Sequence, residues 1–299
     1  MNPTNNPLVG RVLGISISES PDLESLGFSA IHLRDALVEF ARYMLAAGAT
    51  IAYGGDLRAG GFTHTLFDLV STYKGAGGSS ANRIKNYLAW PIHLKLTVAQ
   101  RAELQNSAQI IPLPAPDIAG LDPKTYLPPS TAENTYAWCR SLTQMRERLA
   151  RDNDAQILLG GRLIGYKGKY PGVVEEAYEF MKAGKPLYLI GAYGGATGAV
   201  LESLQGQRPP SLTEQAQFQN DDYRAACEYY NQHAPDTEER IDYTKLVDFF
   251  NKSGIAGLHN GLSVEENERL FSTPHLPEVI ALVFKGLIAV TASDSVKQP

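Results

Sequence analysis

The stretch that decides the fold is AQILLGGRLIGYKGKYPGVVEEA, residues 155–177. It opens with a short run rich in apolar residues, which is typical of a strand buried on both faces. The pair Gly160–Gly161 ends this run, and a helix is predicted to begin after Pro171 and Gly172, because proline is favoured at a helix start. A strand, a glycine-rich turn and a helix in this order form the building unit of a parallel sheet.

Two more segments have the same order of elements. TIAYGGDLRAGG at residues 50–61 and PLYLIGAYGGATG at residues 186–198 each run from an apolar strand into a glycine pair. RVLGISIS at 11–18 predicts a further buried strand, and apolar residues at helical spacing predict helices at 29–47 and 132–151. The expected fold is therefore α/β, a Rossmann-like open parallel sheet with helices on both faces.

The remaining segments are less regular. We interpret residues 86–96 as a strand with a proline-distorted end, and residues 112–129, rich in proline and aspartate, as a long surface connection. Residues 8–205 are expected to form the Rossmann-like core. Amphipathic and apolar segments after residue 240 predict further helices, so residues 206–299 are expected to complete the same domain as a helical extension.

Composition narrows the function classes. The chain has 299 residues, 43% of them hydrophobic and 20% charged, which is ordinary for a globular protein. The formal net charge of −5 argues against a nucleic-acid partner, since proteins that coat nucleic acid carry a basic excess. Cys139 and Cys227 are far apart in the sequence and the six histidines are scattered, so neither a disulfide framework nor a metal site is expected.

The expected location is the cytoplasm. The N-terminal sequence MNPTNNPLVG has neither the basic start nor the apolar run of a signal peptide. The sequence has no apolar stretch that approaches the roughly 18 residues of a membrane-spanning helix, so no membrane partner is expected. Two lone cysteines also fit a reducing compartment.

The glycine pairs predict a ligand site. In an open parallel sheet, ligands bind at the carboxyl ends of the strands. Glycine there lets the backbone approach a phosphate, and the amides at a helix N-terminus attract it. The pattern is neither GxGxxG after the first strand nor GxxxxGK[ST], so an ordinary dinucleotide dehydrogenase or a P-loop NTPase is a poor match. We predict a phosphate-bearing, nucleotide-type ligand and no required cofactor. The predicted contacts are Ser16, Gly54, Gly55, Asp56, Arg58, Gly60, Gly61, Gly160, Gly161, Lys167, Gly172, Glu175, Gly194 and Gly195.

The segment at residues 145–177 resembles the signature of the LOG family, the lysine-decarboxylase-like phosphoribohydrolases. In that signature a Met-x-x-Arg-Lys element precedes a strand and a PGGxGTxxE loop. Met145 to Arg148 stand in the position of the first element, DAQILLGG matches the strand, and PGVVEEA occupies the place of GTxxE. Residues 11–204 resemble more widely the SLOG superfamily, which joins the LOG enzymes with DNA-processing proteins and nucleotide-sensing domains of bacterial defence systems. This resemblance implies a Rossmann-like fold and a nucleotide or nucleotide-derived ligand.

The resemblance also implies a catalytic pair, Arg148 and Glu176. A carboxylate can stabilise the oxocarbenium-like state of N-glycosidic cleavage, while an arginine holds phosphate or ribose oxygens. However, Leu149 replaces the lysine of the motif, Val173 replaces its threonine, and RLIGYKGKY is inserted after the glycine pair. Arg148 also fits a solvated helix face with i,i+4 ion pairs.

Three functions follow from these observations. The first is a sensor that binds a nucleotide-derived, ADP-ribose-like signal in a bacterial signalling or defence system, which the altered motif favours. The second is an N-ribohydrolase or ribosyl transferase that acts on nucleoside monophosphates through Arg148 and Glu176. The third is single-stranded DNA binding, which the acidic net charge disfavours. A homo-oligomer is expected, through the apolar residues 279–290 and the pair Tyr229–Tyr230.

Overall fold

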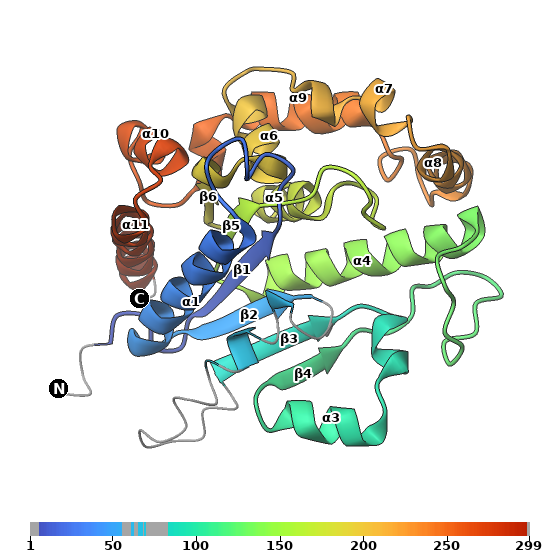
Figure 1. Cartoon of the computed structure of the whole chain (residues 1–299), viewed down its shortest axis with the longest axis horizontal. Coiled ribbons are helices and arrows are strands. Elements are labelled where there is room, and N and C mark those ends of the chain that lie inside the picture. The colour runs from blue at the N-terminus through green and yellow to red at the C-terminus, as the bar shows by residue number, and fades with distance from the viewer. Residues whose placement is uncertain (1–5, 56–60, 63–64, 68, 70–82, 298–299) are drawn as a thin grey trace.

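The computed structural model describes residues 6–55, 61–62, 65–67, 69 and 83–297. Its centre is a sheet with the strand order β4-β3-β2-β1-β5-β6, in which every neighbouring pair is parallel (Figure 1). The strands are β1 (Val12–Ser18), β2 (Thr50–Gly54), β3 (Ile84–Leu88), β4 (Gln109–Pro112), β5 (Ala155–Gly160) and β6 (Leu187–Ile190). The predicted α/β, Rossmann-like fold is confirmed.

Helices cover both faces of the sheet. Successive residues of each strand point to opposite sides, and apolar side chains on both sides need to be buried. Ile15 and Ile157 face a core built with α1 and α11, whereas Ala52 and Leu158 face a core built with α4, α5, α6 and α9. The bounds of the helices are α1 (Ala30–Ala46), α3 (Val98–Gln105), α4 (Ala132–Asp152), α5 (Gly172–Lys182), α6 (Gly195–Leu204), α7 (Glu214–Gln217), α8 (Asp221–His233), α9 (Tyr243–Ser253), α10 (Val264–Ser272) and α11 (Leu276–Lys297).

The part of the chain after residue 205 packs on both sides of the sheet. Helix α9 contributes Phe250 to one core, and α11 contributes Val283 to the other. Tyr230, on which the expected oligomer surface partly rested, is 1% exposed, and Val279 is 2% exposed. These side chains fill the cores of the chain itself. Tyr229 is half-buried, however, and Ile288 is 47% exposed, so the suggested surface and the oligomer both stay predictions.

Two segments differ from the sequence-based assignment. Residues 86–96 are not one strand, since β3 ends at Leu88 and Ile92–Lys95 form a 3₁₀-helix. Pro91 precedes this turn, and a proline cannot donate a hydrogen bond to a continuing strand ladder. The sequence analysis also missed α3 and β4, which are short and largely exposed. Neither a helix nor a strand forms between residues 113 and 131.

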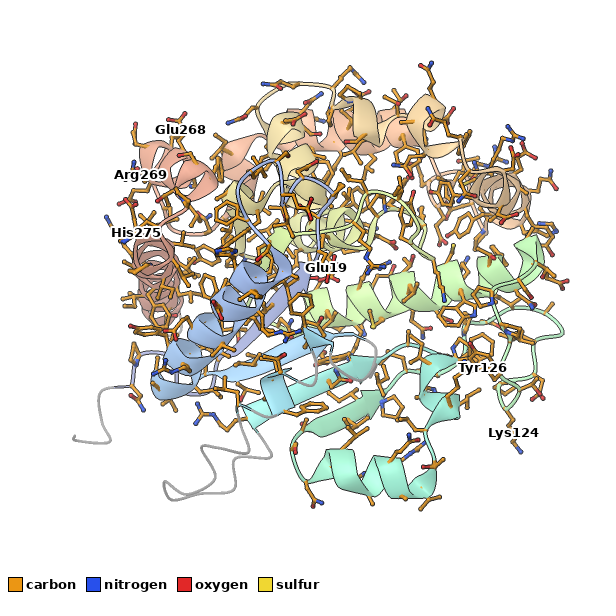
Figure 2. The ribbon with its side chains drawn as sticks, in the orientation of Figure 1. Glu19, Lys124, Tyr126, Glu268, Arg269 and His275 are labelled. Atoms are coloured by element: carbon orange, nitrogen blue, oxygen red, sulfur yellow. The ribbon has the colours of Figure 1, made fainter. Side chains whose placement is uncertain are left out.

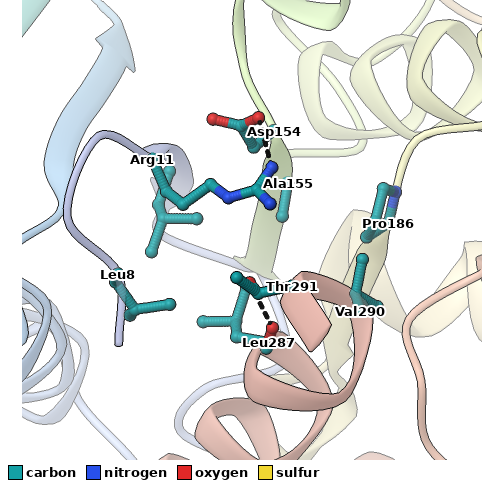
Figure 3. A pocket seen from close by; sticks show the side chains of 9 residues that line it. Leu8, Arg11, Asp154, Ala155, Pro186, Leu287, Val290 and Thr291 are labelled. Carbon is teal, nitrogen blue, oxygen red and sulfur yellow. Dashed lines mark hydrogen bonds and ion pairs between the residues drawn. The ribbon is translucent and has the colours of Figure 1, made fainter. Parts of the chain in front are cut away.

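The amino ends of β1 and β5 are closed by an ion pair. Arg11 donates to Asp154 at 3.1 Å, and both residues line a small cavity with Leu287 and Thr291 of α11 (Figure 3). The volume of this cavity, about 20 Å³, is room for one water molecule. The cavity lies at the edge of the sheet opposite to the predicted ligand site, so we assign it no ligand.

Candidate functional site

The topological switch point of the sheet lies between β1 and β5. Ser18 at the end of β1 is in register with Gly160 at the end of β5. From there the chain continues to α1 on one face and to α5 on the other. In open parallel sheets, ligands bind at the carboxyl edge where neighbouring connections diverge in this way.

The glycine pairs after β5 and β6 pack against each other. Gly160, Gly161, Gly194 and Gly195 all have positive φ angles, between 62° and 110°. A Cβ on Gly161 would lie 2.7 Å from the Cβ of Ala196, and one on Gly195 would lie 2.4 Å from the carbonyl oxygen of Gly161. Internal packing and backbone conformation therefore explain these glycines. Their contact with a ligand stays a prediction.

The loop that follows β1 covers the start of α6 (Figure 1). The backbone N–H of Gly195 donates to Oδ2 of Asp22 at 2.7 Å, and the hydroxyl of Ser20 donates to the carbonyl oxygen of Tyr193 at 2.7 Å. A carboxylate of the protein thus lies at the helix N-terminus, where anions are favoured. Asp22 occupies a position that the sequence analysis gave to a ligand phosphate.

Glu175 is held by a buried arginine that the sequence analysis did not select. The guanidinium of Arg146 and the hydroxyl of Thr143 both donate to the Glu175 carboxylate. The Arg146 side chain is 8% exposed and that of Glu175 is 1% exposed. A Cβ on Gly172 would lie 3.0 Å from Nη2 of Arg146, so this glycine lets the guanidinium pack below the start of α5. The pair joins α4 to α5.

Arg148 lies on another side of α4, because residues two apart on a helix point in nearly opposite directions. Its side chain is 46% exposed and donates from Nε to Asp152 at 2.7 Å, an i,i+4 pair. Asp152 also accepts from the hydroxyl of Tyr87 on β3 at 2.9 Å. The structure therefore places Arg148 on a half-exposed helix face, in ion-pair contact with Asp152 and not with Glu176.

Glu176 is buried against the sheet, with an exposed fraction of 4%. Nε2 of Gln156 donates to its Oε2 at 2.8 Å, and the hydroxyl of Ser16 is a second hydrogen-bond partner. Burial raises the pKa of Glu176 to about 7, although the positive charge of Arg146 opposes this shift. Ser16, Gln156 and Glu176 therefore form a polar group between β1, β5 and α5.

Tyrosines of the C-terminal helices fix the loop between β5 and α5. The hydroxyl of Tyr166 lies 2.5 Å from that of Tyr243, which in turn lies 2.7 Å from that of Tyr223. The hydroxyl of Tyr223 also donates to the carbonyl oxygen of Lys169 at 2.8 Å. Lys167 in the same loop is exposed, with Nζ 4.9 Å from the centre of the Trp138 ring. Its contact with a phosphate stays a prediction.

The end of β2 is only partly described. Gly54 and Gly55 are half-buried, and a Cβ on Gly55 would lie 2.0 Å from the ring of Tyr53. Gly61 is also half-buried. The predicted contacts Asp56, Arg58 and Gly60 lie outside the described residues.

Glu19 is a further residue that the sequence analysis missed. It follows β1 directly, is exposed, and lies at the middle of the carboxyl edge (Figure 2). Among the described residues, no group of three or more histidine, cysteine, aspartate or glutamate side chains is placed to hold a metal ion. The polar groups of this edge can thus offer hydrogen bonds and carboxylate charge.

A comparison with known families decides the assignment. The family model described as SLOG cluster2 matches residues 7–270. The chain belongs to the SLOG family. The resemblance to the SLOG superfamily is confirmed by this match, and SLOG membership indicates a small nucleotide-related ligand. No curated protein matches the chain.

The SLOG match extends beyond the predicted core into α10, so the family pattern includes most of the C-terminal helices. The tyrosine contacts give a structural reason for the length of the match, because Tyr223 of α8 and Tyr243 of α9 bond to the loop that leads into α5. Within the described residues of this SLOG protein, no helix is both long and apolar enough to span a membrane.

Proposed function

We propose that this SLOG protein is a sensor that binds a nucleotide-derived, ADP-ribose-like molecule and does not hydrolyse it. The observation that carries the proposal is the engagement of both candidate catalytic groups within the protein. Glu176 is bonded to Gln156 and Arg148 to Asp152, and the neighbouring carboxylate of Glu175 is bonded to Arg146. The resemblance to nucleotide-sensing domains supports a role in a bacterial signalling or defence system.

This arrangement is poorly suited to N-glycosidic cleavage. Such catalysis needs a carboxylate that meets the charge developing on the ribose in the transition state. Glu176 already accepts a hydrogen bond at 2.8 Å from Gln156 and has a second partner in the hydroxyl of Ser16. The arginine that would hold the phosphate is turned toward Asp152 on a different face of α4. A binding module needs neither group to be exposed.

One observation favours the enzyme as a second candidate. The pKa of Glu176, raised to about 7 by burial, suits a group that exchanges protons near neutral pH. Burial by itself raises the pKa of a carboxyl whether or not it is catalytic, and Glu179, one turn further along α5, also has its pKa raised to about 7 by burial. Glu179 is therefore a matched control.

A binding screen combined with a turnover assay tests the proposal. AMP, ADP, ADP-ribose and NAD are each added to the full chain, and the melting temperature is recorded. A ligand that binds the native state raises this temperature by linkage. Base release from the same compounds is then followed chromatographically for the native chain, Glu176→Gln and Glu179→Gln. We expect binding of at least one compound and no base release.

The variants separate the two functions. Loss of a group that acts on the transition state typically lowers the rate by about 100- to 1000-fold. Base release by the native chain that falls by this factor in Glu176→Gln, but persists in Glu179→Gln, would overturn the sensor and establish the enzyme. A chain that binds none of the four compounds would overturn the sensor as well.

A further inference from the structure

Asn86 is a buried asparagine whose amide has no partner. It lies in β3, two residues before the end of the strand, with an exposed fraction of 0%. Neither Nδ2 nor Oδ1 has a hydrogen-bond partner among the described residues. Burying an unsatisfied amide group costs roughly 1–3 kcal/mol by protein mutational data. An unpaired donor and acceptor in one side chain therefore need an explanation.

Two other buried or half-buried asparagines, Asn260 and Asn231, have hydrogen-bond partners for both amide atoms. Asn260 is 2% exposed, and its Nδ2 donates to the carbonyl oxygen of Leu187 at 2.9 Å and to Oδ1 of Asn267 at 2.8 Å. Asn231 donates to the carbonyl oxygen of Ile241 at 3.0 Å and accepts from its N–H at 2.7 Å. Asn153 is 0% exposed and lacks a partner at Oδ1, but its Nδ2 donates to Gln156 at 3.3 Å. Asn86 differs from all three because neither of its amide atoms is bonded among the described residues.

The position of Asn86 connects it to the ligand edge. In register, Asn86 is the partner of Tyr53 on β2. Both residues point to the α1 side of the sheet, since Tyr53 and Ile84 belong to that core and Asn86 is two residues from Ile84. Neighbouring strands are about 4.8 Å apart. The free amide therefore lies beside an aromatic ring, and that ring packs against Gly55 at the start of the predicted ligand loop.

We propose that Asn86 recognises the edge of an adenine base. A carboxamide offers one donor and one acceptor side by side, and adenine presents the complementary pair through its 6-amino group and a ring nitrogen. The ring of Tyr53 adds an aromatic surface of the kind on which bases stack. The inference rests on the proposed function, because it assigns the base-recognising residue of the same nucleotide site.

The native chain gives the first test. Binding of AMP is compared by calorimetry with binding of purine riboside 5′-monophosphate, which lacks the 6-amino group, and with GMP and CMP. A bidentate asparagine–adenine contact predicts that AMP binds about 10- to 100-fold more tightly than the analogue. Equal binding of AMP and its analogue, or tighter binding of GMP or CMP, overturns the inference.

The variant Asn86→Leu gives the second test, with Asn231→Leu as a bonded control. Replacing the unsatisfied amide by an apolar group of similar size should leave the melting temperature of the free chain unchanged or raise it. The preference for AMP over its analogue should vanish. Asn231→Leu should lower the melting temperature and keep the preference.

The outcomes distinguish this inference from the proposed function. If Asn86→Leu keeps the preference for AMP, or if it lowers the melting temperature as Asn231→Leu does, the amide is structural and the inference falls while nucleotide binding stands. If the native chain binds no nucleotide, the proposed function falls and the inference falls with it. If Asn86→Leu does not fold, the comparison of AMP with its analogue on the native chain decides, and equal binding of the two overturns the inference.

Discussion

The two halves of the carboxyl edge differ in how far their polar groups are satisfied. At the β5–β6 half, Asp22 accepts from Gly195 at 2.7 Å, and Thr197 donates to the carbonyl oxygen of Gly160 at 2.9 Å. At the β2–β3 half, both amide atoms of Asn86 lack a partner among the described residues. Both halves carry glycine pairs in the sequence. Nε of Arg146, which pairs with Glu175, also lacks a partner among the described residues. The contrast therefore concerns the strand ends and the turns that follow them, where the Asn86 amide can still bond to a ligand.

The largest expected effect on stability comes from removing Arg146, the buried partner of Glu175. Arg146→Leu leaves the carboxylate of Glu175 buried without its cation, so unfolding should become easier by about 3–5 kcal/mol. Urea denaturation measures this change. Arg148→Leu is the matched control, and its half-exposed pair with Asp152 should contribute at most about 1 kcal/mol. If the two variants have equal effects, the assignment of Arg146 as the buried cation of Glu175 is wrong.

The second effect is a pH dependence that comes from Glu176. Its pKa is near 4.5 when unfolded and about 7 in the folded chain, so folding favours the protonated form. The stabilisation is complete below pH 4.5 and is lost as the pH rises through 7, up to about 3 kcal/mol for this shift. Urea denaturation at pH 5 and pH 8 should therefore show a larger loss for the native chain than for Glu176→Gln. Equal losses would mean that Glu176 is ionised over the whole range.

The smallest effect concerns Asp22. Asp22→Ala removes the carboxylate from the N-terminus of α6, which should lower the free energy of unfolding by about 1 kcal/mol. Asp22→Asn keeps an acceptor and should lose less. Nucleotide affinity should not change, because this half of the edge is complete without a ligand. Tighter nucleotide binding by Asp22→Ala in calorimetry would show that a ligand phosphate competes with Asp22.

The sequence predicted the elements that carry strong patterns. The strand at residues 155–159 and the helix at 132–151 are found as β5 and α4, because apolar runs, helical spacing and glycine stops are local signals. Short exposed elements such as α3 and β4 have weak patterns and were missed. The glycine pairs marked the carboxyl edge, but positive φ angles and close packing explain the two pairs after β5 and β6 equally well.

The site was harder to predict than the fold. The motif favoured Arg148, whereas the structure pairs Arg146 with Glu175. Which of two arginines on one helix faces α5 depends on how α4 lies across the sheet. That placement is set by contacts between residues distant in sequence, such as the packing of the Leu149 side chain against Gly54. Asn86 lies in the ordinary strand sequence IKNYL. No local pattern shows that an amide there lacks partners.

The placement of α11 has a consequence for synthesis on the ribosome. Ile15 and Tyr188 of the sheet share their core with Val279, Val283 and Leu287 of that helix. A nascent chain that already includes β1 to β6 therefore exposes this apolar face until residues 276–287 have left the ribosome. Exposed apolar sheet surface is prone to misassembly during translation. The packing of α11 on this face is thus postponed until after all six strands have been made.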